Sequence, residues 1–220
     1  GEIKLENKTN HLQGSVQLYT NMGRHKFYDG FKSNDYTYGL SVYQHWKSAG
    51  NFSVAAGMDL IRYGGKAENK FAYLPNGMPS VNEDEHILST AGAYVLGFSN
   101  PVRPVNIKAG IRYQYNSLPL SAVAPVLGVT LTPLESVSLY GNYQTGFSFP
   151  TLRDLYLFPS ANESLEEQRI RSSEFGARYN WNTADFIQMA LFRNDAKNLI
   201  QALPNASPPP LVTFQNSGDA

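Results

Sequence analysis

The sequence contains no cysteine, which excludes disulfides, thiolate metal sites and a cysteine nucleophile. Charged residues are scarce, at 16% of the chain, and the 18 basic and 18 acidic side chains cancel. That balance argues against a nucleic-acid clamp and against a polybasic membrane patch. Long hydrophobic runs are missing too, because Pro119, Pro125 and Pro133 interrupt the most apolar stretch, residues 118–134. Interior prolines remove backbone hydrogen bonds that hydrocarbon cannot replace, so any span of a bilayer must be made by strands.

The 220 residues are rich in tyrosine and glycine. Aromatic side chains make up 13% of the chain, with 14 tyrosines, and there are 18 glycines, while mean hydropathy is only −0.35. Low charge with modest hydropathy is typical of sheet proteins that have one apolar and one polar face. The first eight residues have no apolar core, so no signal peptide is visible there.

Alternation of apolar and polar side chains predicts a series of two-faced strands. In residues 105–116 the odd positions include Ile107, Ile111 and Tyr113, and the even positions include Lys108 and Arg112. A slip by one residue would turn both charges toward the apolar side, at about 2–4 kcal/mol each in lipid. Ten runs of this kind have the length of roughly 9–11 residues that a tilted membrane strand needs, or approach it. They cover residues 12–18, 36–47, 52–60, 86–98, 105–116, 122–131, 136–145, 173–182, 184–193 and 211–215.

The connections between these runs alternate in length. Short links at 48–50, 100–103, 133–135 and 182–183 alternate with long ones at 21–35, 63–85, 147–170 and 196–210, and only the link at 117–121 is shorter than this pattern requires. Short turns on one side and long loops on the other are typical of outer-membrane barrels. Aromatic side chains also stand near strand ends, as at Tyr36, Tyr38, Trp46 and Trp181. A soluble β-sandwich, such as an adhesin or lectin, alternates as well and stays open as an alternative.

A succession of motifs occupies the last third of the chain. Residues 139–156 read LYGNYQTGFSFPTLRDLY, and the loop NESLEEQ follows at 162–168. A strand opens with SEFGA at 173–177, and ALFRNDAKNLI at 190–200 and FQNSGD at 214–219 complete the series. In order and spacing this series resembles the β-barrel of TonB-dependent outer-membrane receptors. The positions that match the family motif are Gly146, Phe147, Pro150, Thr151, Leu152, Arg153, Leu155 and Tyr156.

The match has departures and a weaker extension upstream. Ser148 and Phe149 stand where the family often has arginine and alanine, and the loop at 162–168 lacks the usual prolines. Segments 21–35, 64–68 and 109–113 look most like the branch of the family that takes up cobalamin, siderophores and heavy-metal chelates.

The resemblance implies an all-β fold, an antiparallel transmembrane β-barrel fragment in which residues 1–220 form roughly ten strands of about 22. It also implies that the plug domain and the remaining strands lie outside this sequence. We therefore expect a receptor in the outer membrane of a Gram-negative bacterium, in contact with lipid, with no cofactor and no nucleic-acid partner. Its expected partners are a small metal chelate, such as a ferric siderophore or cobalamin, and the TonB complex, which acts through the missing plug.

The resemblance also indicates where contacts should lie. The candidate cargo contacts are the loop residues Arg24, His25, Phe27, Tyr28, Phe31, Tyr73 and Asn76. The candidate plug-facing residues in the lumen are Lys108, Arg112, Glu174 and Arg178. The motif at 146–156 is predicted to shape the mouth of the barrel: Pro150 ends strand pairing, Thr151 caps the following turn, and the leucines pack back onto the rim. Arg153 and Asp154 are expected to contact a neighbouring loop or the plug.

Catalytic and metal sites are not expected from the residues. The four histidines, His11, His25, His45 and His86, have no tight metal-binding spacing, and the acidic loop pairs 84–85 and 166–167 are interpreted as solvated. A ten-stranded outer-membrane protease is the enzyme alternative, because the strand count matches. Its water-activating Asp–His dyad and acidic pair would have to come from Asp35, Asp59, Asp84 and His86.

Overall fold

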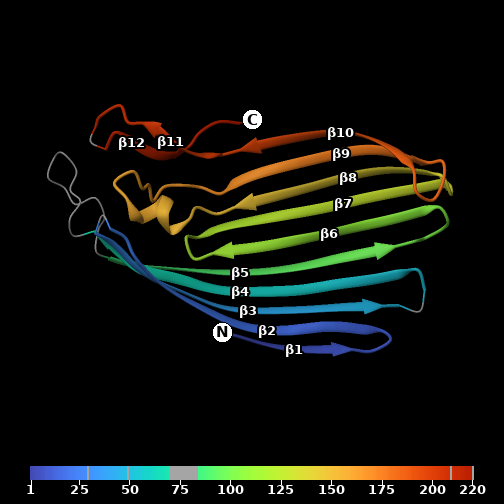
Figure 1. Ribbon diagram of the computed structural model, residues 1–220, viewed down its shortest axis with the longest axis horizontal. Helices are drawn as coiled ribbons and strands as arrows, with labels where there is room; N and C mark the ends of the chain where they lie inside the picture. Colours follow the sequence, from blue (N-terminus) through green and yellow to red (C-terminus); the bar gives the residue numbers. More distant parts are fainter. Residues whose placement is uncertain (29, 49, 70–83, 209, 220) are drawn as a thin grey trace.

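A computed structural model describes residues 1–28, 30–48, 50–69, 84–208 and 210–219 of the chain. In these ranges, ten strands form one antiparallel sheet in simple chain order, from β1 to β10 (Figure 1). They are β1 (Glu2–Lys8), β2 (Leu12–Lys26), β3 (Phe31–Lys47), β4 (Phe52–Asn69), β5 (Asp84–Ser99), β6 (Val105–Asn116), β7 (Leu120–Leu134), β8 (Val137–Ser148), β9 (Gln168–Asn180) and β10 (Phe186–Lys197). A separate hairpin pairs β11 (Ile200–Pro204) with β12 (Val212–Asn216). Helix is confined, in the described ranges, to the turn η1 (Arg153–Leu157), and no helix there could cross a membrane.

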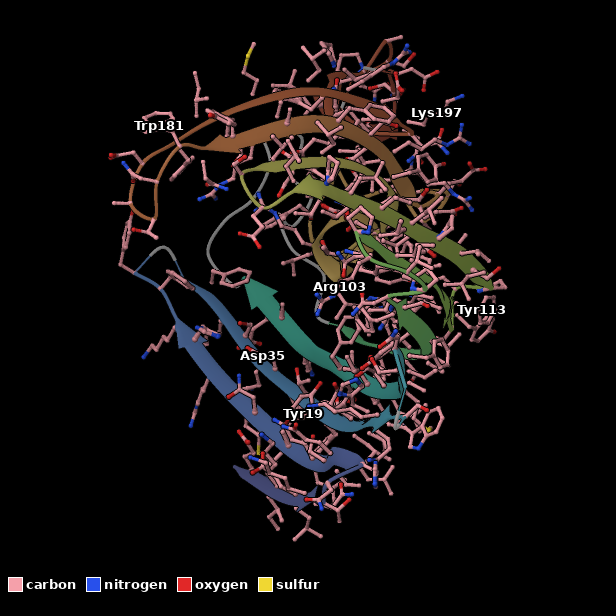
Figure 2. All side chains as sticks on the ribbon, turned by 90° about the vertical axis from the view of Figure 1, so that its right-hand side faces the viewer. Tyr19, Asp35, Arg103, Tyr113, Trp181 and Lys197 are labelled. Carbon is pink, nitrogen blue, oxygen red and sulfur yellow. The ribbon has the colours of Figure 1, made fainter. Side chains whose placement is uncertain are left out.

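The alternation predicted from the sequence sets the two faces of the sheet. Ile111 of β6 pairs with Pro125 of β7, while Arg112 pairs with Ala124, so odd and even positions of β6 lie on opposite faces. Figure 2 looks along the strands from the end with the short turns, and it shows the sheet curving into an open arc with Tyr113 on the convex side. Ile111 and Tyr113 are 48% and 49% exposed, because no second layer of the described residues covers them. The β-sandwich alternative is therefore wrong, and a curved single-layer wall is confirmed.

Two strands differ from the sequence-based prediction. The wall begins with β1, which the alternation did not predict because it has only two apolar positions, Ile3 and Leu5. The predicted strand at 211–215 exists as β12, but it pairs with β11 and not with the wall. Asn198 stands between β10 and β11 with φ of 56°, a left-handed conformation that asparagine tolerates, and the chain leaves the wall there. Ten wall strands thus occur, but they are not the ten predicted.

The long connections are also shorter than predicted. Residues 21–35 were expected to be a loop, yet β2 continues to Lys26 and β3 begins at Phe31, with pairs such as Arg24 with Asn34. β4 likewise continues to Asn69. Backbone pairing satisfies N–H and C=O groups whether or not the side chains are apolar, so apolar alternation finds only the part of a strand that faces hydrocarbon. β2, β3 and β4 therefore extend the wall beyond the apolar belt on the loop side, at the left of Figure 1.

A small hydrophobic core lies at the loop end, on the concave side of the wall. Leu88 of β5 packs with Leu155 and Leu165, and all three are nearly fully buried. Tyr63, Leu118, Leu152, Tyr156, Ile200 and Phe214 surround this cluster. The segment from Ser148 to Gln168, which carries the family-like motif, therefore folds back against the inside of the wall.

Candidate functional site

The middle of the concave face carries an ion pair that spans two strand gaps. The guanidinium of Arg112 in β6 donates to Asp59 Oδ2 in β4, with Nη1 at 3.1 Å and Nη2 at 3.0 Å. Gly92 of β5 stands between them, and a Cβ added there would come within 2.8 Å of Arg112 Nη2. The missing side chain at position 92 is what lets the arginine reach across β5.

This ion pair is part of a larger polar cluster. Ser41 of β3 donates to Asp59 Oδ1 at 2.7 Å, and Arg112 donates to Gln114 at 3.0 Å. The guanidinium carbon of Arg112 also lies 5.8 Å from the ring centre of Tyr94. Four neighbouring strands, β3 to β6, therefore share one network, and its central charges are compensated.

A second polar cluster occupies the concave face of β8, β9 and β10. Tyr140 donates its hydroxyl to Glu174 at 2.9 Å, and Gln188 donates to the Tyr140 oxygen at 3.0 Å. Arg178 donates to Asn180 at 2.9 Å and stacks 3.7 Å over the ring centre of Phe186. The four predicted lumenal residues, Lys108, Arg112, Glu174 and Arg178, all lie on this face by their register. Contact with a plug stays a prediction for each of them.

The motif loop is closed by a reciprocal cap. Asp154 Oδ2 accepts hydrogen bonds from the Thr151 amide at 2.9 Å and the Thr151 hydroxyl at 2.7 Å, and Thr151 Oγ1 accepts from the Asp154 amide at 3.3 Å. The predicted cap at Thr151 is confirmed. The Asp154 carboxylate therefore forms its hydrogen bonds within its own turn. The guanidinium carbon of Arg153 lies 5.6 Å from the ring centre of Phe158. Both residues therefore make local contacts, and a contact of either one with a neighbouring loop or the plug stays a prediction.

Asparagines join the motif loop to the β11–β12 hairpin. Asn162 donates to the Phe214 carbonyl at 2.8 Å, and Asn216 accepts from the Glu166 amide at 2.8 Å. Asn216 also donates to the Asn198 carbonyl at 2.8 Å. The sequence analysis placed these asparagines in separate motifs and assigned them no common role. The structure brings the motifs together, through polar contacts around the apolar cluster of Leu155, Leu165 and Phe214.

A cavity of about 180 Å³ lies between the motif loop and the loop-side ends of β3, β4 and β5. Its walls include the ring of Tyr156, which stacks on His86 at 3.9 Å with the planes 3° apart. Gly65 lies at its floor, where a side chain would meet the main chain of Asn34. Burial, and then the nearby Glu163 charge, raise the pKa of Tyr156, so its hydroxyl stays protonated. The lining residues are Phe31, Ser33, Asn34, Asp35, Gly64, Gly65, Lys66, Ala67, His86, Leu152, Tyr156 and Leu157.

The predicted cargo contacts are only partly near this cavity. His25 Nε2 lies 3.0 Å from Asp35 Oδ1 at the cavity rim, and Phe31 lines the cavity. Arg24 belongs to the opposite, convex face, because β2 is a strand there and not a loop. Phe27 packs edge-on against Phe31 at 5.6 Å, and Tyr28 is fully exposed. Tyr73 and Asn76 lie outside the described residues.

The residues proposed for the enzyme alternative do not come together as one catalytic group in the described part of the chain. His25 and Asp35 do form a dyad at the rim, but Asp59 is held by Arg112 and Ser41, and His86 is stacked on Tyr156. In the ranges that the structure describes, no group of three or more histidine, aspartate or glutamate side chains could hold a metal ion. His11 Nδ1 donates to the Lys47 carbonyl oxygen at 3.2 Å, at the opposite end of β3 from the cavity.

Comparison with known proteins gives a consistent result. A family model described as TonB dependent receptor-like, beta-barrel matches residues 4–220. The vitamin B12 transporter BtuB of Vibrio vulnificus is 27% identical over 168 residues, which are 75% of this chain and 25% of that protein. This chain therefore spans a much shorter length than that relative.

Solved structures share the fold. The siderophore receptor PirA of Pseudomonas aeruginosa superposes with a TM-score of 0.79 and 17% identity, over 99% of this chain and 41% of that one. The hemophore receptor HasR of Serratia marcescens, solved as a double mutant with its hemophore HasA and heme, superposes with a TM-score of 0.72 and 16% identity, over 98% of this chain and 43% of that one. At these identities the likeness concerns the fold alone.

Proposed function

This chain belongs to the family of TonB-dependent receptors, whose β-barrels lie in the Gram-negative outer membrane, and on that premise we propose that it helps to take up a scarce, bulky nutrient chelate. The cargo class that we propose is a ferric siderophore, cobalamin or a similar metal chelate. Family members are transporters and receptors and not enzymes, which argues against the protease alternative.

The observation that carries the proposal is the cavity under the motif loop. Its lining residues lie at the loop end of the wall, and by register Phe31, Asp35 and His86 among them face the concave side, where a solute from outside the cell would arrive. Its lining combines flat apolar surface, from Tyr156 and Phe31, with polar groups at Asp35 and Ser33. Such a mixture suits a ligand that presents both rings or alkyl parts and hydrogen-bonding groups. We propose that this cavity takes one arm of the chelate, with His25, Phe27 and Tyr28 near its rim, and that Tyr73 and Asn76 also contact the cargo.

Tight capture explains why uptake needs energy. A ligand that is scarce must be bound strongly, and strong binding makes spontaneous release slow. We propose that the TonB complex supplies the work for release through a plug domain encoded outside this sequence. The open edges of the sheet at β1 and β10, within the described residues, and the 41% coverage of PirA support a wall that continues in other parts of the protein.

The concave polar residues are proposed to hold that plug. Lys108 has no ion pair within the described residues, whereas Arg112 is already compensated by Asp59, so Lys108 is the stronger candidate for a charged plug contact. Arg178, stacked on Phe186, still has N–H groups to donate. Alanine at Lys108 or Arg178 should raise pore leakage of the complete receptor in a planar bilayer. Unchanged leakage and uptake in both variants would contradict the plug contact.

The cargo proposal is tested by filling the cavity. Ala67 lies in the cavity wall and is buried, so Ala67→Phe in the complete receptor should weaken cargo binding by at least about tenfold. Ala190→Phe places the same bulk on the concave face of β10, away from the cavity, and should leave binding unchanged. Binding is measured with purified receptor against ferric siderophores, cobalamin, heme and copper. Equal affinities of both variants for a cargo that binds the parent would refute the cavity as its site.

A further inference from the structure

Two aspartates of the concave face differ in how their charges are compensated. Asp59 accepts hydrogen bonds from Arg112 and Ser41, so both of its carboxylate oxygens are occupied. Asp35 lines the cavity under the motif loop, and there Nε2 of His25 lies 3.0 Å from its Oδ1. Within the described residues no donor reaches Oδ2 of Asp35, and this side chain is 48% exposed. Asp35 therefore keeps an acceptor oxygen for a ligand.

Glycines flank Asp35 on both neighbouring strands. Across β2 to β5, one row of paired residues on the concave face reads Gly23, Asp35, Gly65 and His86. The carboxylate lies over Gly23, where an added Cβ would clash with Oδ2, so it leans away from Gly65. The space above Gly65 therefore separates Asp35 from the stacked rings of His86 and Tyr156.

The surroundings of this space are short of positive charge. Burial, and then the carboxylate of Glu163, raise the pKa of Tyr156, so the nearby charge that acts on this hydroxyl is negative. Lys66 borders the cavity, but by register its side chain lies on the convex face. The Arg153 guanidinium lies over an aromatic ring outside the cavity lining. Among the described residues, an anionic group in this space would meet Asp35 with a single histidine to compensate it.

We propose that Asp35 determines the specificity of the cavity by selecting a chelate arm that donates N–H hydrogen bonds and carries no negative charge. Oδ2 accepts from this arm, which enters above Gly65 and lies beside the ring of Tyr156. Ser33 lines the cavity two residues away on the same face of β3, so its hydroxyl can donate to a carbonyl of the arm.

These groups match a carboxamide or an alkylammonium and repel a catecholate or a carboxylate. A volume of about 180 Å³ holds such a short arm and not a whole chelate, since it corresponds to about six water molecules. The inference rests on the proposed uptake function and narrows the class of its cargo.

The test compares chelates that differ in one arm only. One set is a linear ferric trihydroxamate that ends in an ammonium, an acetamide or a carboxylate. The other is cobalamin beside the form in which one carboxamide is hydrolysed to a carboxylate. Binding to the purified complete receptor is measured by isothermal titration calorimetry.

For a chelate that binds the parent, the forms with a donor arm should bind about tenfold to 100-fold more tightly than the carboxylate form, as expected for a hydrogen bond to a charged group. Asp35→Asn should reduce this preference below about threefold, because the asparagine amide can donate to a carboxylate.

The matched control is Glu85→Gln, which removes one carboxylate at the same end of the wall from the convex face. It should change the preference less than about twofold. An equal loss of preference in Glu85→Gln would mean that the overall charge of the mouth selects the arm, and it would overturn the role of Asp35.

The Ala67→Phe variant separates the two possible failures. Equal binding of all arms by the parent, with binding lost in Ala67→Phe, would overturn the selection by Asp35 and keep the cavity as the cargo site. Unchanged binding in Ala67→Phe would refute the cavity as the cargo site, and this inference with it.

Discussion

The wall and the mouth of this half-open barrel are stabilised in different ways. In the wall, each strand pairs its backbone only with the strands directly beside it, apolar side chains such as Ile111 stay exposed, and stability comes mainly from this pairing and from lipid. At the mouth, Leu155 and Leu165 are buried as in a soluble domain, and asparagines bridge segments far apart in sequence. The apolar side chains of the wall are therefore removed from water by the bilayer, whereas those of the mouth are removed from water by packing against other parts of the same chain.

Truncation of the mouth core should show the largest effect. Leu155→Ala removes a side chain that is 98% buried, and the resulting cavity should cost about 2–5 kcal/mol of local stability. Amide hydrogen exchange of the complete receptor should rise in residues 149–167 and 200–216 and stay unchanged in β6 and β7. Leu127→Ala, on the convex face, is the control and should change amide hydrogen exchange little in detergent. Similar effects of the two substitutions would erase the distinction between the regions.

A charge on the convex face tests the bilayer as the core of the wall. Ile111→Arg should cost about 2–4 kcal/mol in lipid vesicles, because the guanidinium enters hydrocarbon. Gln144→Arg carries the same charge at similar depth on the concave face and should be tolerated there. The equilibrium between folded and urea-unfolded receptor in vesicles measures both. If Gln144→Arg proved the more damaging, the assignment of the two faces would be reversed.

The polar network of the wall should respond to a side chain at position 92. Gly92→Val blocks the path from Arg112 to Asp59 and should cost about 1.5–3 kcal/mol, as expected for charge-assisted hydrogen bonds. In the Gly92→Val background, Asp59→Asn should cause little further loss of stability, and a double-mutant cycle of thermal unfolding measures this. Gly97→Val is the control on the same strand, since the nearest atoms to its Cβ are 3.7 Å away. Additive losses would mean that the arginine does not depend on Gly92.

The smallest effect is expected at the cap of the motif loop. Thr151→Ala removes the hydroxyl that bonds with Asp154 and should lower local stability by about 0.5–2 kcal/mol. Limited proteolysis should then cut faster within residues 149–167, with β8 and β9 intact. Thr145→Ala, in the wall, should leave the cleavage rate unchanged. A cleavage rate unaffected by Thr151→Ala would show that the leucine core alone holds the loop.

Much of the wall could be predicted because its physics is local. The alternation in residues 105–116 fixes the lipid face one strand at a time, and neither a partner strand nor a ligand is needed to recognise it. β1 was not predicted, because Ile3 and Leu5 are too few to show an alternating pattern. The extensions of β2 to β4 were not predicted, because polar strand segments show no alternation of apolar and polar residues. Among the site residues, the concave positions of Arg112 and Glu174 followed from alternation, whereas Arg24 was misplaced because it was assigned to a loop.

The sequence alone determined which side chains face hydrocarbon and which motifs identify the family, because both are written in residue order and spacing. Only the tertiary structure decided which distant groups meet: Asp59 with Arg112 across a glycine, and Asn162 and Asn216 with their carbonyls. The reason is that alternation is a property of one strand, while a contact depends on strand register and on how a loop folds back. Those follow from pairing and packing over many residues, which no single segment contains.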